Sequence, residues 1–205
     1  MAVVVLISGR GSNLEALLRA GIPVSAVISN VAGAGGLAIA AKAGIPAKVV
    51  SHKDFSSRDA FDDVLAKQID EFRPTLVALA GFMRVLTPGF VQRNAGRLIN
   101  VHPSLLPAFP GLDTHRRALS EGVKIHGCTV HLVTADLDHG PIVAQATVPV
   151  RRDDTGESLA ARVLSLEHVV YPRAIRWFLD GKLVIENGLV RVKGNDAQLL
   201  SSDST

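Results

Sequence analysis

The sequence predicts an α/β protein with a mostly parallel central sheet, helices on both faces, and antiparallel strands added in the C-terminal half. Three observations predict this class. Short apolar runs without alternating polar residues fill the first half of the 205-residue chain, as in strands buried on both faces. Segments with helical spacing, each closed by glycine or proline, separate these runs. From residue 125 the apolar residues alternate more with polar ones, which is typical of antiparallel strands.

The first half alternates between strands and helices. The runs that predict strands are 3–7, 24–28, 47–50, 75–80 and 96–102. The intervening helices are expected at 12–21, 35–44 and 56–72. Strands that alternate with helices in this way form βαβ units, so these strands should lie parallel to one another.

The second half is expected to begin with two longer antiparallel strands, 125–134 and 141–150, joined by a turn-rich connection. An amphipathic helix should follow over 156–182, and Pro172 should kink it or divide it in two. Asn187-Gly188 marks the turn of a small terminal hairpin.

Length and composition indicate one folded domain, with apolar residues at 47% and charged residues at 20%. We expect a single domain over 1–190 and a flexible C-terminal tail over 191–205. Cys128 is the only cysteine, so no internal disulfide can form and a cytoplasmic location is the simplest expectation. No apolar run approaches the ~18 residues of a membrane span, so no membrane partner is expected.

The charge pattern argues against a nucleic-acid partner. The net charge is +3, the basic residues are scattered, and aromatic residues make up only 4% of the chain, which is a poor stacking platform for bases. A mild positive balance suits small anionic ligands, although the surface of any soluble protein can have it.

A glycine loop, SGRGSN at 8–13, separates the first strand from the first helix. Such a turn exposes backbone N–H groups at a helix N-terminus and can bind phosphate. The dinucleotide pattern G-x-G-x-x-G is incomplete because Leu14 takes the third glycine position, and no acidic residue ends the second strand. A mononucleotide or sugar phosphate is therefore favoured. The alternative is a tight turn that Ser12 or Asn13 caps and that binds nothing.

Metal and covalent chemistry have weaker support. The seven histidines do not fall into a known metal-ligand spacing, and the single cysteine adds no pair, so no metal is expected. Ser8 and Ser104 are candidate nucleophiles by residue type only, because GRGSN is not the G-x-S-x-G elbow. For His115 we expect a structural or capping role.

Asn100 and His102 form the most informative pair. Two positions apart on the fifth strand, they share a face at its carboxyl end, where open α/β sheets bind their ligands. An amide N–H can stabilise a developing oxyanion and an imidazole can move protons, so the pair suits acyl-group transfer. Asp136 or Asp138 could supply a carboxylate that favours the imidazolium, although an Asp in a turn is more often an Asx cap.

Several motifs follow one another in the order and spacing of a known family: ISGRGSN, SRDAFD, LAGFMRVL, LINVHPSLLPAFPGLDTH, GCTVHLVTADLDHGPIVAQ and LEHVVYP. Over about residues 1–190 the chain resembles the glycinamide ribonucleotide formyltransferases, folate-dependent enzymes of purine synthesis. The resemblance implies a Rossmann-like formyltransferase fold. It also implies transfer of the formyl group of 10-formyltetrahydrofolate to the amine of 5-phosphoribosylglycinamide. The products would be 5-phosphoribosyl-N-formylglycinamide and tetrahydrofolate, in de novo purine (IMP) biosynthesis.

The resemblance also implies the site residues. Catalysis would fall to Asn100, His102 and Asp138. Phosphoribosylglycinamide would be bound by Gly11, Ser12, Asn13 and Glu167. Formyl folate would be bound by Arg58, Met83, Arg84, Val85, Leu86, Asn100, Thr134, Ala135, Asp136, Leu137 and Asp138. The folate would be a co-substrate, with no tightly bound cofactor and no metal, and the protein would be a monomer or a weak homodimer that binds small molecules only.

Two positions depart from the family pattern, and three rival functions remain. Leu164 replaces a frequent Gln, so any polar contact from this position is lost or made elsewhere, and His139-Gly140 replaces the Gly-Gly that some relatives have in the loop. A formyltetrahydrofolate deformylase shares the Asn, His and Asp but usually has an N-terminal regulatory domain, which we do not expect here. A methionyl-tRNA formyltransferase would add a basic C-terminal domain. A non-catalytic nucleotide-sensing module would bind phosphate without needing the Asn, His and Asp.

Overall fold

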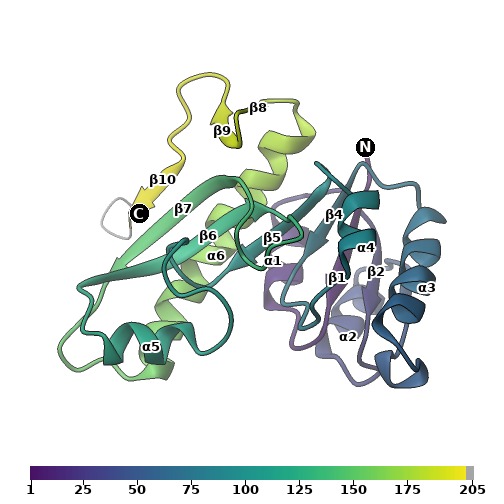
Figure 1. The fold of residues 1–205 in the computed structure, drawn as a ribbon, viewed down its shortest axis with the longest axis horizontal. Helices are drawn as coiled ribbons and strands as arrows, with labels where there is room; N and C mark the ends of the chain where they lie inside the picture. Colours follow the sequence, from purple (N-terminus) through teal and green to yellow (C-terminus); the bar gives the residue numbers. More distant parts are fainter. Residues whose placement is uncertain (202–205) are drawn as a thin grey trace. The chain divides into compact units, whose positions relative to one another are not determined.

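The structure is a computed structural model, and it describes residues 1–201. Contacts divide the chain into two compact units, Met1–Asn100 and the part that begins at Val101, which we describe separately (Figure 1). The expected single domain over 1–190 stays a prediction, as does the flexible tail. Residues 202–205 of that tail lie outside the described residues.

The first unit contains a parallel sheet. Its strands are β1 (Val3–Ile7), β2 (Val24–Ser29), β3 (Ala47–Val49), β4 (Leu76–Leu79) and β5 (Leu98–His102). They follow the order β3-β2-β1-β4-β5, and every neighbouring pair is parallel. All residues of β1 and β4 are buried, which explains why their sequences show no alternation.

Helices cover both faces of this sheet. They are α1 (Ser12–Arg19), α2 (Gly35–Lys42), the short 3₁₀ helix η1 (His52–Asp54), α3 (Arg58–Asp70) and α4 (Pro88–Arg93). α1 packs on α2 and α3 on α4, and Figure 1 shows the two pairs on opposite faces. Opposite faces are expected, because the strand order runs one way from β1 to β3 and the other way from β1 to β5, while crossovers are right-handed.

The second unit is built on two long antiparallel strands. These are β6 (Ile125–Leu132) and β7 (Ile142–Pro149), and α6 (Gly156–Leu179) packs against both. β10 (Leu199–Ser201) pairs with β7 in parallel, and β8 (Leu183–Glu186) with β9 (Leu189–Val192) forms the terminal hairpin. The remaining helix is α5 (Thr114–Ser120).

The predicted fold class is confirmed, with parallel strands and helices in the first half and antiparallel strands in the second. One of the two outcomes expected for Pro172 is excluded: α6 runs without interruption through Pro172, so the proline does not divide the helix, and the kink stays a prediction. A Thr155 capping box fixes the start of α6, and contacts with β6 and β7 support its length, so tertiary packing outweighs the local cost of the proline.

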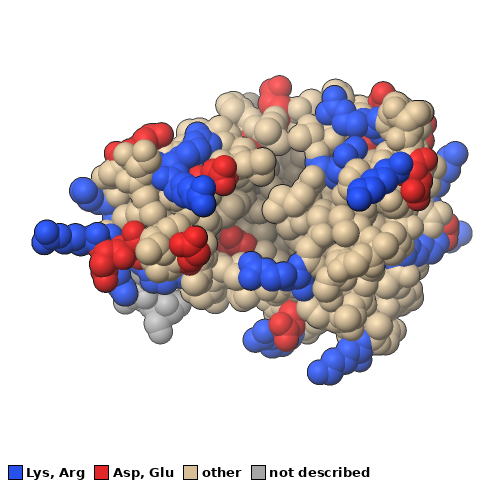
Figure 2. All heavy atoms as spheres, turned by 90° about the horizontal axis from the view of Figure 1, so that it is seen from below, with Lys and Arg blue, Asp and Glu red and all other residues tan. Residues whose placement is uncertain are grey.

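The charged residues show no segregation by sign on the face seen in Figure 2, where Lys and Arg lie among Asp and Glu. In the part of the chain that the structure describes, no helix has the length and hydropathy needed to cross a membrane.

Candidate functional site

The glycine loop of the first unit ends in a helix start that no side chain caps. Gly11 is the N-cap of α1 with a φ of 84°, and no side-chain cap hydrogen bond is present at this end. A Cβ at Gly11 would lie 2.5 Å from the Cα of Gly36 in α2, so a larger residue cannot take its place without a backbone shift. Neither Ser12 nor Asn13 is the capping residue, and the positive end of α1 therefore has the features of an anion site.

The segment 83–86, between β4 and α4, exposes two apolar side chains. Met83 is 71% exposed and Val85 53%, whereas Leu86 is buried. The guanidinium of Arg84 lies 5.4 Å from the centre of the Phe61 ring on α3. Arg58, exposed at the start of α3, precedes Phe61 by three positions and so shares its helix face. Exposed apolar groups together with the cation of Arg84 suit a ligand with a flat ring and acidic groups.

His102 and Asp138 lie together in the second unit. His102 Nδ1 is 3.4 Å from Asp138 Oδ2, and the two side chains are only 7% and 9% exposed. Asp138 Oδ2 also accepts a hydrogen bond of 2.9 Å from the backbone N–H of Gly111. Asn100 precedes His102 by two positions on β5, so both side chains leave the strand on the same face.

The contacts of the His102 ring indicate where its protons lie. Nε2 is 3.0 Å from the backbone oxygen of Phe109, which can only accept, so Nε2 carries a proton. Nδ1 faces the Asp138 carboxylate, and a proton there turns a repulsive contact into an ion pair. Both ring nitrogens of His102 therefore have a polar partner in the structure.

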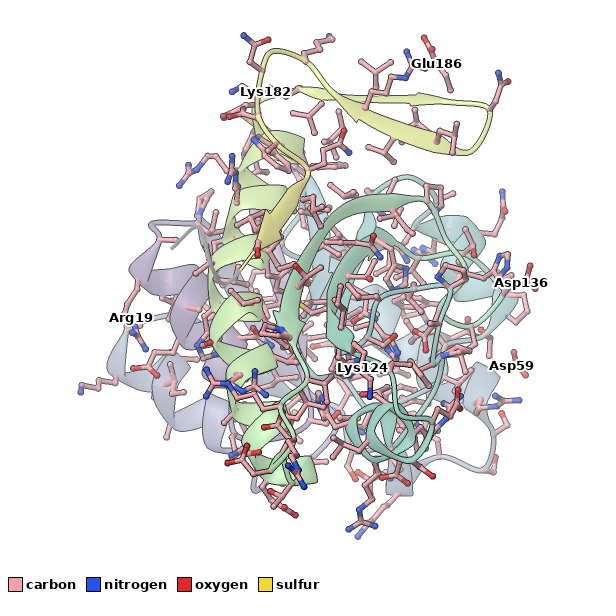
Figure 3. The ribbon with its side chains drawn as sticks, turned by 90° about the vertical axis from the view of Figure 1, so that its left-hand side faces the viewer. Arg19, Asp59, Lys124, Asp136, Lys182 and Glu186 are labelled. Carbon is pink, nitrogen blue, oxygen red and sulfur yellow. The ribbon has the colours of Figure 1, made fainter. Side chains whose placement is uncertain are left out.

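The two candidate aspartates of the β6–β7 connection lie in different surroundings. Asp138 approaches His102, while Asp136 lies exposed at the outer end of the connection (Figure 3). Thr134, Ala135 and Leu137 are exposed as well, so these four residues are available to a ligand. His139 is also exposed.

A second histidine near Asp138 was not assigned to the site from sequence. His131 Nε2 lies 3.9 Å from Asp138 Oδ1, and burial is the main reason why the pKa of His131 is lowered. The sequence contains a signal for this contact. His131 lies at the end of one hairpin strand and Asp138 shortly before the other, so a tight β6–β7 pairing brings the two residues close.

Glu167 is a buried carboxylate on α6, 7% exposed. Burial, and then the negative charge of Glu167, raise the pKa values of the Cys128 thiol and the Tyr171 hydroxyl. Leu164, one turn earlier on the same helix, is partly buried and apolar. Glu167 thus places a negative charge in the interior of the second unit.

The other candidates have structural contacts. Ser104 is fully buried and its hydroxyl donates to the backbone oxygen of Ala108 at 2.6 Å, which leaves it no catalytic base. His115 packs edge-on against His126, with ring centres 5.2 Å apart. Among residues 1–201, no three His, Cys, Asp or Glu side chains are grouped so that they could hold a metal ion.

Fold and site together define an α/β protein equipped for acyl-group transfer, with an amide and a carboxylate-paired imidazole at the end of a strand. Residues 1–175 match the formyl transferase family, and the chain belongs to that family.

Named relatives match nearly the whole chain. A phosphoribosylglycinamide formyltransferase of Escherichia coli (strain K12) is 48% identical over 200 residues, which cover 95% of this chain and 94% of that protein. The trifunctional purine biosynthetic protein adenosine-3 of Drosophila melanogaster is 48% identical over 191 residues, covering 89% of this chain and 14% of that longer protein. The crystal structure of phosphoribosylglycinamide formyltransferase from Anaplasma phagocytophilum has a TM-score of 0.93 and 46% identity, and the match covers 98% of each chain.

Proposed function

We propose that the protein transfers the formyl group of 10-formyltetrahydrofolate to the amine of 5-phosphoribosylglycinamide, in purine biosynthesis. The observation that carries the proposal is the buried His102–Asp138 pair, 3.4 Å apart, on a strand that presents Asn100 two positions earlier. Relatives that share nearly the whole chain are named for this transfer, which supports it over the deformylase alternative.

The chemistry follows from the charges around the formyl carbon. The substrate amine attacks this carbon, and the Asn100 amide and protonated His102 stabilise the oxygen as it becomes negative. His102 then assists the movement of a proton from the amine to N10 as the C–N10 bond breaks. Asp138, 3.4 Å from Nδ1, keeps the ring oriented. Because both ring nitrogens have partners in the structure, His102 exchanges one contact for the substrate during the reaction.

Binding is divided among the remaining residues. Gly11, Ser12 and Asn13, at the uncapped start of α1, would hold the phosphate, and the buried Glu167 would hold the glycine amine or ribose. The segment 83–86, with Met83 and Val85 exposed, would bind the folate together with Arg58 and the loop from Thr134 to Asp138. The folate would be consumed as a co-substrate. We further propose a cytoplasmic protein, monomeric or weakly dimeric, without a metal, nucleic-acid or membrane partner.

An absorbance assay of folate product, run with and without phosphoribosylglycinamide, tests the proposal. We expect turnover only when the amine is present. His102→Ala should lower kcat by about 10²- to 10⁴-fold, the usual contribution of a proton-transferring group. His139→Ala is the matched control, because this exposed histidine lies beside Asp138 in sequence but outside the proposed site. Equal turnover without the amine would identify a deformylase, and full activity of His102→Ala would rule out the mechanism.

A further inference from the structure

We propose that Ser8 is a positioning residue for the folate: its hydroxyl fixes the backbone of the segment 82–87 and so holds the apolar ligand surface in place. The inference rests on the proposed function, which assigns Met83 to Leu86 to formyl folate. All residues that carry it belong to the first unit.

Ser8 makes one hydrogen bond to the segment and one to Gly81, the residue just before it. The backbone N–H of Met83 donates to Ser8 Oγ at 2.8 Å, and the backbone N–H of Ser8 donates to the oxygen of Gly81 at 3.2 Å. Ser8 directly follows β1, a fully buried strand, so the segment is attached to the core of the unit.

A buried amide sets the direction of the Ser8 hydroxyl. A serine hydroxyl has one proton, and here it goes to Asn30 Oδ1 at 2.5 Å. The lone pairs of Oγ are therefore left for the Met83 N–H. Asn30 is 3% exposed, and both its Nδ2 and its backbone oxygen lie 3.1 Å from Nδ1 of His52, so its side chain is enclosed by polar contacts. Since an amide oxygen is no general base, this arrangement also excludes Ser8 as an activated nucleophile.

The far end of the segment is held in a similar way. The backbone N–H of Thr87 donates to Oδ2 of the buried Asp62 at 2.6 Å. Side chains from elsewhere in the unit thus hold the backbone at both ends, while Met83 and Val85 stay exposed. Neighbouring apolar side chains kept out of a core in this way indicate a binding surface.

The experiment compares Ser8→Ala with Ser25→Ala by hydrogen exchange and by steady-state kinetics. Losing one hydrogen bond should speed exchange of the Met83 amide and raise KM for 10-formyltetrahydrofolate, each about 5-fold. The KM for phosphoribosylglycinamide and kcat should stay within about 2-fold of wild type, because the reacting groups are untouched. Ser25 is the matched control, since its hydroxyl also bonds a backbone group of this sheet, the oxygen of Val3, at 3.3 Å.

The outcomes separate the two proposals. Unchanged Met83 exchange in Ser8→Ala would overturn the role of Ser8, and so would faster exchange with an unchanged KM for the folate. Equal increases in both KM values would instead indicate general destabilisation and also overturn it. If wild-type protein transfers no formyl group, the proposed function fails, while the exchange data still decide whether Ser8 holds the segment.

Discussion

Asp138 joins two loops of the second unit through one carboxylate. It accepts from the Gly111 N–H, faces His102 and lies near His131, and its own φ is 52°. This left-handed conformation is uncommon for a residue with a side chain and costs on the order of 1 kcal/mol or more. The surrounding contacts must offset that cost, so the carboxylate is held in place before any substrate arrives.

Gly11 is the glycine of the loop 8–13 that leaves less room for a side chain than Gly9 does. Gly11→Ala should destabilise the protein by about 2 kcal/mol and raise KM for phosphoribosylglycinamide, because its Cβ would lie 2.5 Å from Gly36 Cα and its φ of 84° disfavours a side chain. Gly9→Ala, in the same loop, meets nothing within 4 Å and should behave as wild type. Urea unfolding and steady-state kinetics measure both effects. Equal stability of the two variants would show that the close approach of α1 and α2 is not constraining.

At the scale of elements, the β6–β7 hairpin positions Asp138. The strands pair in antiparallel register, with an irregularity between Val130 and His131, and the N–H of Leu132 donates to the oxygen of Pro141. The residues between Leu132 and Pro141 therefore form a short connection, and the hydrogen bond between Leu132 and Pro141 fixes its two ends.

Gly140 closes this connection, and its replacement should move Asp138. A Cβ at Gly140 would lie 1.7 Å from the Leu132 oxygen, so Gly140→Ala must displace the backbone; we expect a loss of at least about 2 kcal/mol and a fall in kcat. Gly156→Ala, at the start of α6, meets only a side-chain carbon at 3.5 Å and serves as the control. Chemical unfolding and the formyl-transfer assay provide the measurements. A Gly140→Ala protein with wild-type kcat would contradict this role of the hairpin.

The sequence predicts those elements whose signal is local and long. Continuous apolar runs and helical spacing predict the core strands and α1, α2, α3 and α6, while α5 has only seven residues and its N-cap, Asp113, makes no side-chain cap hydrogen bond. Neither α5 nor α4 is predicted from the sequence, although Thr87 followed by Pro88 is a recognisable signal for the start of α4. β10 has three residues and exists through its pairing with β7.

For the candidate site, too, the sequence predicts what local spacing determines and does not predict what depends on the fold. Asn100 and His102 are recognisable because their two-residue spacing alone places them on one face. The choice between Asp136 and Asp138 depends on the fold of the connection, which spacing does not encode. Ser8 and Asp62 escape sequence analysis because each accepts from a backbone N–H far along the chain, 75 and 25 positions away.

For the molecule as a whole, histidines of the second unit with lowered pKa values, His126 foremost, connect stability to pH. His126 is 1% exposed and lies between the rings of His115 and Phe109, with ring centres 5.2 and 5.9 Å away. Burial, and then the charge of His115, lower the pKa of His126 from 6.5 to about 4. The pKa of His115 is lowered too, by burial first and then by the charge of His102.

Acid should therefore weaken the fold in a defined window. As pH falls below 6.5 the unfolded chain takes up a proton on residue 126 before the folded protein does, so the free energy of unfolding falls until about pH 4 and then levels off for this group. Within the window, each such histidine can change the folding equilibrium by up to about 10-fold per pH unit.

Urea unfolding at several pH values should show that the free energy of unfolding depends less steeply on pH in His126→Gln than in wild type. His139→Gln, which changes an exposed histidine, should keep the wild-type slope. Identical slopes for His126→Gln and wild type would mean that His126 does not link protonation to unfolding.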